Sequence, residues 1–483
     1  MMIFSTFFSP QHREKRIIIF IVSLALFMDA LDTTIINTAI PAMSHSLHVH
    51  PVDLKIALIS YLISLAIFIP ISGWIGDKYG IKRVFMLALA IFTVSSLWCG
   101  YAQTLFELVI ARSCQGLGGS LMLPLGRLII LRTFQRHELV EAMNAVVMVV
   151  SIGLMLGPLA GGFITDHLSW HWIFWVNIPV GILAIAMAWH WMNDTPPQKV
   201  RPFDFLGFIL FGGGLAALTF SLSDLSESTA NSTIAFGIMG IAILMLVCYF
   251  LHSYKQPHPV INMTLFRLRT FQISIVGNLI ARLGFGGVPF LLPLLLQIGL
   301  GYSAQLSGLL LVPIAFGILL VKSISLRILR FVGYKRLLLI NTILVGFSLW
   351  TLCLVNMHTS VYLIAVFTFI FGFLISLQYS GMNSLAYADI ATEDLSAATS
   401  LVSTMQQLAQ SFGVAASALL LTYFSYSPTV IGKHLALTPT IFHQTFLAMG
   451  IFTIFSTLIF TRLKVNDGHQ MLTVPAQEKI ATH

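Results

Sequence analysis

Fourteen apolar stretches run along this chain, and each is long enough to cross a lipid bilayer as a helix. A transmembrane helix needs about 20 predominantly apolar residues. The stretches lie near residues 17–41, 54–76, 84–102, 105–131, 140–165, 171–192, 205–222, 233–252, 270–297, 304–329, 337–356, 360–387, 396–424 and 440–461. The turns between them are short, which leaves no room for a large domain outside the membrane. We therefore expect an all-α membrane protein with fourteen transmembrane helices.

The composition agrees with a chain that lies in the bilayer. Hydrophobic residues make up 57% of the 483 positions and charged residues 9%, whereas about a quarter of a soluble protein is charged. These values exclude a water-soluble domain, a disordered chain, a collagen-like fibre and a secreted domain held by disulfides. The four cysteines lie inside apolar stretches without metal-ligand spacing, so we interpret them as small packing residues.

Lysine and arginine gather on one side of the predicted membrane. Cytoplasmic loops carry an excess of both residues. With an even number of spans both termini share a side, and that side holds twenty of the 26 lysines and arginines. We therefore expect both termini in the cytoplasm. The net charge of +8 then reflects topology, and we expect no nucleic-acid partner.

A short repeat divides the chain into two halves. The segment GIKR at 80–83 matches GYKR at 333–336, and both lie between two spans on the predicted cytoplasmic side. Two six-helix halves related by duplication would produce this pattern, with spans seven and eight as an insertion between them. The predicted parts are a cytoplasmic N-terminus (1–16), an N-terminal six-helix bundle (17–192), two inserted helices with linkers (193–269), a C-terminal six-helix bundle (270–461) and a cytoplasmic tail (462–483).

The segment GWIGDKYGIKRVF at 73–85 combines small residues, a tight turn, one acid and several bases. Its glycines allow close helix approach and turn dihedrals. Asp77 can hydrogen-bond the N-terminus of a neighbouring helix and pair with a base. We predict a cytoplasmic gate made of Gly73, Asp77, Gly80, Lys82 and Arg83.

This segment resembles the signature G-x-x-x-D-x-x-G-x-[KR]-[KR] of the major facilitator superfamily. Further segments resemble signatures of its fourteen-helix drug:proton antiporters: LDTTIINTAIP at 31–41, ARSCQGLGG at 111–119 and WHWIFWVNIPVG at 170–181. The fifth span is similar to their antiporter motif through Gly153, Gly157, Pro158, Gly161 and Gly162. Details of 27–41 and 169–182 resemble most closely one bacterial branch of this family.

The resemblance covers nearly the whole chain, and it implies the major facilitator fold and a bacterial inner-membrane location. It further implies a seal at the periplasmic side from the fifth-span motif and a proton-transfer role for Arg112. An ordinary small-residue packing face would give the same glycine pattern. One departure is that Arg330 stands in the second copy of the loop where Asp77 stands in the first, so the C-terminal gate cannot use the same acid.

Two acids, Asp29 and Asp32, lie well inside the first span. Three residues apart, they share one face of a helix. Because a carboxylate at membrane depth is costly, it indicates an ion or substrate pathway. We predict that Asp32 couples protons or senses substrate, with Asp29 as its partner. Alternatively, one or both acids only support polar contacts between helices.

Bases also occur inside the spans. Arg112 and Gln115 lie one turn apart in the fourth span, so both can face the bundle interior. A guanidinium keeps its proton, so we expect Arg112 to influence an acid, or simply to pair with one, rather than to carry the proton.

In the C-terminal half, Arg282 and Lys322 have no acid within the spans to neutralise them. This balance favours a carboxylate-bearing or mixed-charge substrate over a simple lipophilic cation. The alternatives are that Lys322 extends toward the membrane surface and that Arg282 pairs with dipoles. The predicted substrate cavity comprises Asp32, Asn37, Gln115, Arg282 and Lys322.

No nucleotide-binding, dinucleotide or nucleophile motif occurs, so the sequence predicts no enzyme activity, no cofactor and no metal site. We predict a monomeric secondary transporter with a small-molecule substrate, protons and the lipid bilayer as its partners. The leading function is multidrug export by proton antiport. Export of an anionic metabolite, such as a polycarboxylate or siderophore, and a transport-inactive receptor or scaffold remain as alternatives.

Overall fold

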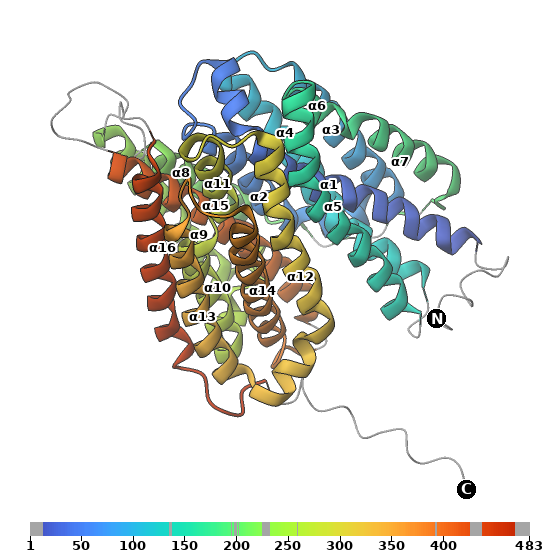
Figure 1. Ribbon diagram of the computed structural model, residues 1–483. Coiled ribbons are helices and arrows are strands. Elements are labelled where there is room, and N and C mark those ends of the chain that lie inside the picture. Colours follow the sequence, from blue (N-terminus) through green and yellow to red (C-terminus); the bar gives the residue numbers. More distant parts are fainter. Residues whose placement is uncertain are drawn as a thin grey trace, which may run out of the picture.

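A computed structural model (Figure 1) describes residues 13–134, 138–194, 196–197, 200, 202–224, 232–257, 259–391, 394–425 and 437–468. Most of the two predicted terminal segments lies outside these ranges. Within them the chain is helical and contains no strand. Fourteen of its segments are long and apolar enough to span a membrane. The prediction of an all-α protein with fourteen transmembrane helices is therefore confirmed.

The N-terminal bundle is defined here as α1 to α7. In it α1 packs on α5, α2 and α3 pack on α4, and α3 also contacts α7. The short α6 and the longer α7 together form one span. The helices are α1 (Arg13–Leu47), α2 (Lys55–Tyr79), α3 (Ile81–Tyr101), α4 (Leu105–Thr133), α5 (Leu139–His167), α6 (Trp172–Trp175) and α7 (Asn177–Trp191).

The C-terminal bundle is defined as α10 to α16. In it α10 contacts α14, α15 and α16, while α12 packs on α14 and α13 on α16. A π-helical turn, η4 (Leu295–Gly299), continues α11 and completes one span with α10. The helices are α10 (Arg269–Phe285), α11 (Val288–Leu294), α12 (Ala304–Val332), α13 (Tyr334–Thr351), α14 (Val361–Ala386), α15 (Leu395–Ser425) and α16 (Pro439–Phe460).

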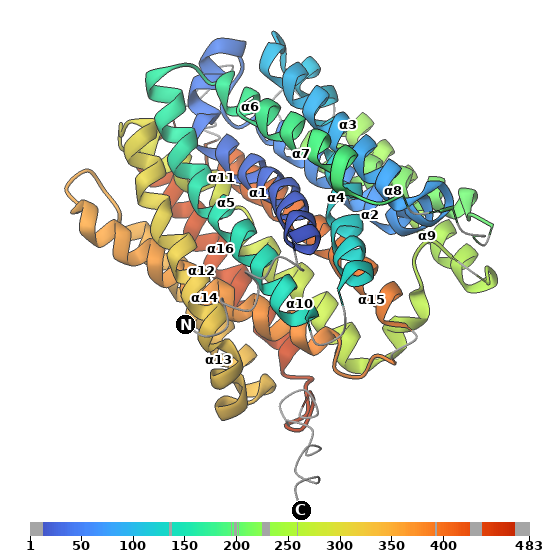
Figure 2. The same ribbon diagram turned by 90° about the vertical axis from the view of Figure 1, so that its right-hand side faces the viewer.

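The inserted helices α8 (Phe205–Asp224) and α9 (Ser232–Lys255) pack against each other. The two bundles meet along two seams, α5 with α12 and α2 with α15, and α8 contacts both helices of the second seam. Figure 2 shows α8 and α9 on the side of α2 and α15, away from α12. Near the start of α8, Asp204 accepts a hydrogen bond from the Gly207 N–H and lies 2.8 Å from His252 of α9. Asp204 thereby links the two inserted helices.

The repeated turns have the same backbone geometry. Gly80 joins α2 to α3 with φ 91°, and Gly333 joins α12 to α13 with φ 78°. The Gly80 N–H donates to Gly76 O at 3.0 Å, and the Gly333 N–H donates to Leu329 O at 2.9 Å. Their ψ values of 128° and 158° lie outside the left-handed helical region. A side chain in such a conformation costs about 1–3 kcal/mol, so both turns require glycine.

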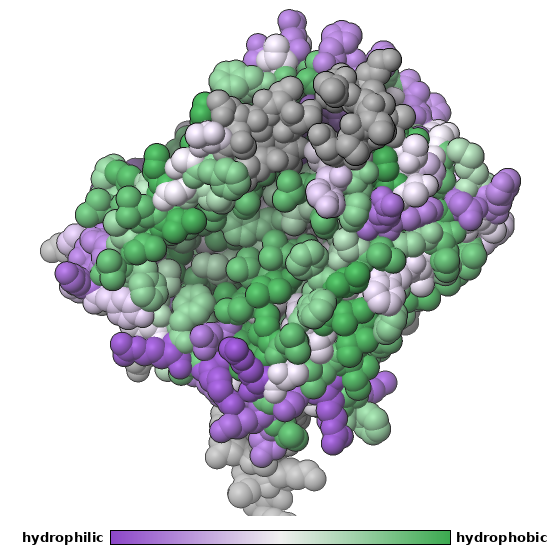
Figure 3. Space-filling model, turned by 90° about the vertical axis from the view of Figure 1, so that its left-hand side faces the viewer, coloured by the Kyte–Doolittle hydropathy of each residue, from purple (hydrophilic) through white to green (hydrophobic). Residues whose placement is uncertain are grey.

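The spans alternate in direction, which gives the molecule two ends. The terminal face is the end that carries the Gly80 and Gly333 turns and the described ends of the chain, and the distal face is the opposite end. Figure 3 shows a broad hydrophobic band between hydrophilic rims. Such a band suits the hydrocarbon layer of a bilayer, and the protein is a multi-pass membrane protein.

Candidate functional site

Asp32 of α1 lies at the centre of a buried polar cluster in the N-terminal bundle. Its Oδ2 is 2.5 Å from Nη1 of Arg112 on α4. Its Oδ1 accepts hydrogen bonds from Gln115 Nε2 at 2.8 Å and from Asn177 Nδ2 at 2.9 Å. Two neighbouring helices, α4 and α7, therefore supply donors to a single carboxylate of α1.

The cluster is completed by contacts among the donors themselves. Arg112 Nη1 also donates to Gln115 Oε1 at 2.6 Å, and Gln115 Nε2 also lies 2.7 Å from the Ser96 hydroxyl. The Arg112 guanidinium lies over the Tyr61 ring, 4.2 Å from its centroid. Asp32 is 0% exposed and Arg112 is 1% exposed. The ion pair is thus sealed from solvent and from lipid in this conformation.

The sequence brings these helices close enough through small residues. A Cβ at Gly116 would lie 2.6 Å from the Tyr61 carbonyl oxygen, so a side chain there would push α4 away from α2. Our sequence analysis selected Asp32, Arg112 and Gln115, and the structure places them together. It overlooked Asn177, Tyr61 and Ser96. An amide at the start of an otherwise apolar helix was the available signal for Asn177.

Asp29 has a different environment from Asp32. Its carboxylate accepts a hydrogen bond from the Tyr61 hydroxyl of α2. Among the described residues no ion pair includes Asp29. The two acids of α1 therefore have different partners, a hydroxyl for one and an arginine for the other. Asn37 lies apart from the cluster, where its side chain donates to Thr34 O at 3.3 Å.

Arg282, near the end of α10, is the buried base of the C-terminal bundle. Its Nη1 donates to Gln410 Oε1 at 3.1 Å and to Gln406 O at 3.4 Å, and its guanidinium lies 4.1 Å from the Tyr379 ring centroid. Its Nε is buried and has no hydrogen-bond partner. None of the ion pairs in the described part of the chain includes Arg282.

Lys322 of α12 lies at the seam with α5. Its Nζ donates to the Ser151 hydroxyl at 2.5 Å, across the two bundles. Ser151 in turn donates to Val147 O within α5. Lys322 therefore meets a hydroxyl, and it does not share the amide and tyrosine neighbours of Arg282.

The small residues of the fifth span separate into two contact surfaces. Cβ atoms at Gly153, Gly157 and Gly161 would each collide with α1, with Gly153 meeting the Phe27 carbonyl oxygen at 2.9 Å. A Cβ at Gly162 would meet Ala304 of α12. Pro158 faces α12 as well, since a Cβ at Gly308 would collide with the Pro158 carbonyl oxygen. α5 thus packs on α1 with one surface and on α12 of the other bundle with the other.

Several hydrogen bonds connect the two bundles near the distal face. Asp166, at the distal end of α5, accepts from the backbone N–H of Gln305 at 2.7 Å and of Ala304 at 3.2 Å, both at the start of α12. Gln297 Nε2 of η4 donates to Thr38 O of α1 at 2.9 Å. Among the described residues, the hydrogen bond between the bundles that lies nearest the terminal face is the one from Lys322 to Ser151. The described hydrogen bonds between the bundles thus lie between the distal face and the middle of the spans.

The predicted gate residues lie at the terminal face. Asp77 pairs with Arg132 of α4 at 2.9 Å, with about a third of each side chain exposed. Lys82 donates to Trp189 O at 3.0 Å and lies 3.8 Å from Asp194. These contacts stay within the N-terminal bundle and the residues that directly follow it.

The remaining gate residues differ in how tightly they are packed. Gly80 forms the turn, Arg83 is exposed, and a Cβ at Gly73 would meet nothing within 4 Å.

A model of the Major Facilitator Superfamily matches residues 22–413 and, in a second match, 274–482. The chain belongs to the major facilitator superfamily. This superfamily is one of transporters, and the fold that the sequence motifs predict is confirmed.

Curated relatives within the superfamily match along nearly the whole chain. The protein named "Putative multidrug resistance protein MdtD" from Escherichia coli (strain 55989 / EAEC) is 37% identical over 469 residues, covering 96% of this chain and 98% of the relative. The protein of the same name from Pectobacterium atrosepticum is 37% identical over 446 residues, covering 92% and 95%. The bacterial branch predicted from 27–41 and 169–182 is thereby confirmed.

Solved superfamily structures share the fold at low sequence identity. The POT family transporter PepTSo has a TM-score of 0.68 at 14% identity, and the match covers 95% of this chain and 98% of that one. A variant of the nucleoside transporter NupG has a TM-score of 0.65 at 11% identity, with 92% and 99% covered. At these identities the likeness supports the fold alone.

Proposed function

We propose that this superfamily transporter exports small molecules, with multidrug efflux as its main activity, in exchange for protons. The observation that carries the proposal is the sealed pair of Asp32 and Arg112. An ionisable pair at membrane depth is costly to bury, and a packing role alone would be met by apolar side chains. The names of the MdtD relatives support a drug-like substrate class.

The unequal surroundings of the two acids support proton coupling. Arg112 balances the charge of Asp32, whereas Asp29 has a hydroxyl partner, Tyr61. We propose that Asp29 binds the proton while this conformation persists, and that Asp32 binds one only after Arg112, Gln115 and Asn177 release it. Helix rearrangement would thereby be linked to protonation. Arg112 keeps its own proton throughout.

Alternating access then uses the seals at opposite ends of the molecule. In our proposal the bundles 17–192 and 270–461 rock against each other around a site between them. The Asp166 contacts and the Pro158 surface close the distal side, and the gate around Asp77 closes the terminal side in the other state. By the excess of lysine and arginine we assign the terminal face to the cytoplasm of a bacterial inner membrane, with the protein acting as a monomer.

A second candidate function, export of an anionic metabolite, is favoured by Arg282. This guanidinium is buried with an unpartnered Nε and with amide and tyrosine neighbours. A carboxylate is the group that a guanidinium binds best, through two parallel hydrogen bonds. A substrate carboxylate would satisfy Nε and balance the charge at once.

Proton flux in proteoliposomes tests the two candidates. A pH-sensitive dye inside the vesicles would report flux when lipophilic cations or polycarboxylates are added. The variants are Asp32→Asn and Arg282→Ala. Matched controls are Asp53→Asn on the distal turn before α2, and Arg336→Ala, which is exposed at the start of α13.

Each outcome identifies one function. Flux with cations that is lost in Asp32→Asn but kept in Asp53→Asn supports drug and proton antiport. Flux only with polycarboxylates, lost in Arg282→Ala but kept in Arg336→Ala, supports the metabolite exporter. Substrate binding without proton flux in the unaltered protein would contradict both and indicate a receptor or scaffold.

A further inference from the structure

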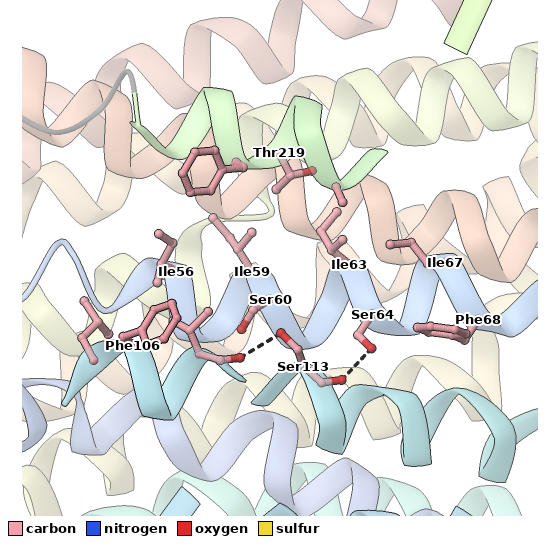
Figure 4. Close-up of a pocket in the computed structure, with 14 residues that line it drawn as sticks. Ile56, Ile59, Ser60, Ile63, Ser64, Ile67, Phe68, Phe106, Ser113 and Thr219 are labelled. Atoms are coloured by element: carbon pink, nitrogen blue, oxygen red, sulfur yellow. Dashed lines mark hydrogen bonds between the residues drawn. The ribbon is translucent and has the colours of Figure 1, made fainter. Parts of the chain in front are cut away.

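A lateral cavity of about 650 Å³ lies between α2, α4 and the inserted helix α8. Its walls are isoleucines of α2 such as Ile59 and Ile63, Val109 of α4, and Ala216 of α8. Figure 4 shows α8 facing α2 across this space, with α4 forming the floor. The volume falls within the range of sites that bind small organic molecules.

The cavity has a closed end and an open end. Toward the terminal face α8 is held against α2, because the rings of Phe68 and Phe208 lie 5.6 Å apart and a Cβ at Gly212 would come within 2.9 Å of Ile67. Near the distal end the mouth carries Phe106, which is 73% exposed, and Phe220, which is 54% exposed. The cavity therefore opens sideways from the apolar flank of the molecule.

The hydroxyl groups in the wall are already satisfied within the protein. Ser60 donates to Ala57 O at 3.1 Å, and Thr219 donates to Leu215 O at 2.9 Å. Ser64 donates to Ser113 O at 2.7 Å, and the Ser113 hydroxyl donates to Val109 O at 2.8 Å (Figure 4). An occupant thus finds no hydrogen-bond donor in need of a partner.

Apolar walls with satisfied hydroxyl groups favour a hydrocarbon occupant over water or a polar solute. A buried water needs two to four polar partners, and a polar solute would lose its own hydrogen bonds here. At membrane depth the material next to the mouth is lipid. A hydrocarbon chain that enters the cavity gains dispersion contacts with walls that otherwise face a void. That gain does not depend on leaving water, so it applies inside the bilayer too.

From this geometry we infer that the cavity binds one acyl chain of a membrane phospholipid. The inserted helices, to which the sequence assigns no chemistry, create the site, because α8 supplies the wall that turns the surface of α2 and α4 into a cavity. The site also adjoins the ion pair, since Ala57 O, in the same turn of α2 as Ile59, accepts from Arg112 Nε at 3.5 Å.

Photocrosslinking tests the inference on the whole protein. The protein is reconstituted in phosphatidylethanolamine and phosphatidylglycerol vesicles that contain a phospholipid with a diazirine in one acyl chain. After illumination, labelled peptides are mapped by mass spectrometry. We expect more label on the cavity segments 56–68 and 105–113 than on α13, whose exposed residues report ordinary lipid contact.

Filling the cavity should remove that excess. Ala216→Phe adds a ring from the exposed side of α8, and Val109→Phe adds one from α4, neither removing a side-chain hydrogen bond. The matched control Ala186→Phe places the same ring on an exposed position of α7. Label on the cavity segments should fall to the α13 level in the two filling variants and stay high in the control.

Two results would overturn the inference. One is equal labelling of the cavity segments and α13 in the unaltered protein, and the other is an excess that survives both filled variants. Correct folding is checked by thermal unfolding and gel filtration, and either filling variant alone suffices if the other does not fold. The readout requires no transport, so its failure is separate from failure of the proposed antiport.

Discussion

In the part of the chain that the structure describes, each bundle buries one arginine between its helices, and the two arginines have opposite kinds of neighbours. In the N-terminal bundle Arg112 meets the carboxylate of Asp32 at 2.5 Å. In the C-terminal bundle Arg282 meets two glutamines and a tyrosine. Among the described residues, one arginine thus has an acid beside it and the other has only uncharged partners. In our proposal the first bundle couples conformation to protonation, and the second bundle recognises the substrate.

Removing the paired arginine should have the largest effect. Arg112→Gln leaves Asp32 buried without its cation, and breaking a buried pair in this way costs about 3–5 kcal/mol. We expect the free energy of unfolding, measured by steric trapping in bicelles, to fall by that amount.

The double variant is the control for this prediction. Asp32→Asn combined with Arg112→Gln should recover much of the stability while proton flux stays absent. If the double variant were as unstable as Arg112→Gln alone, the buried charge would not be the cause of the loss.

The two bundles should behave alike at their repeated turns. Gly80→Ala and Gly333→Ala each force a side chain into a positive φ with extended ψ, which costs about 1–3 kcal/mol. Equal losses in thermal stability would show that the turns are equivalent despite the different charges beside them. Gly73→Ala, whose Cβ has open space inside α2, serves as the control and should keep or slightly raise the stability. A loss at only one of the two turns would contradict the equivalence.

Removing the second arginine sharpens the contrast. Arg282→Gln removes a buried charge and leaves no acid behind, so we expect the unfolding free energy to change by less than about 1 kcal/mol. Loss of the ring contact with Tyr379 and relief of the uncompensated charge act in opposite directions. A loss as large as that of Arg112→Gln would show that an acid pairs with Arg282 after all.

The smallest effect is expected at the exposed pair of Asp77 and Arg132. Asp77→Asn should cost about 0.2–1 kcal/mol in stability, as exposed ion pairs do. At 1 M salt, where charges are screened within about 3 Å, the difference from the unaltered protein should nearly vanish. Arg330→Gln, at the equivalent place in the C-terminal bundle, provides the comparison. A salt-independent loss in Asp77→Asn would contradict an exposed electrostatic contact.

Hydropathy and short motifs predict much of this architecture. The number of spans and the equivalent turns follow from apolar length and a short repeat, and the charges at membrane depth single out Asp32 and Arg112 without predicting that they pair. The partners of Arg282 do not follow from the sequence. Gln406 and Gln410 are amides one turn apart in a long helix, and their approach to α10 depends on how each helix is rotated. The position of α8 on one seam is likewise a matter of packing that composition leaves undetermined.

The ion pair also imposes an order on biosynthesis. Arg112 follows Asp32 by 80 residues, so at about 5–20 residues per second the acid waits about 4 to 16 s for its partner. During this interval α1 enters the bilayer with two acids, each costing about 2.5–3.5 kcal/mol at the helix centre. Until α4 is present, the apolar residues of α1 must offset that cost without help from Arg112. The first helix can therefore insert early, but its final packing is deferred until the ribosome has delivered the fourth.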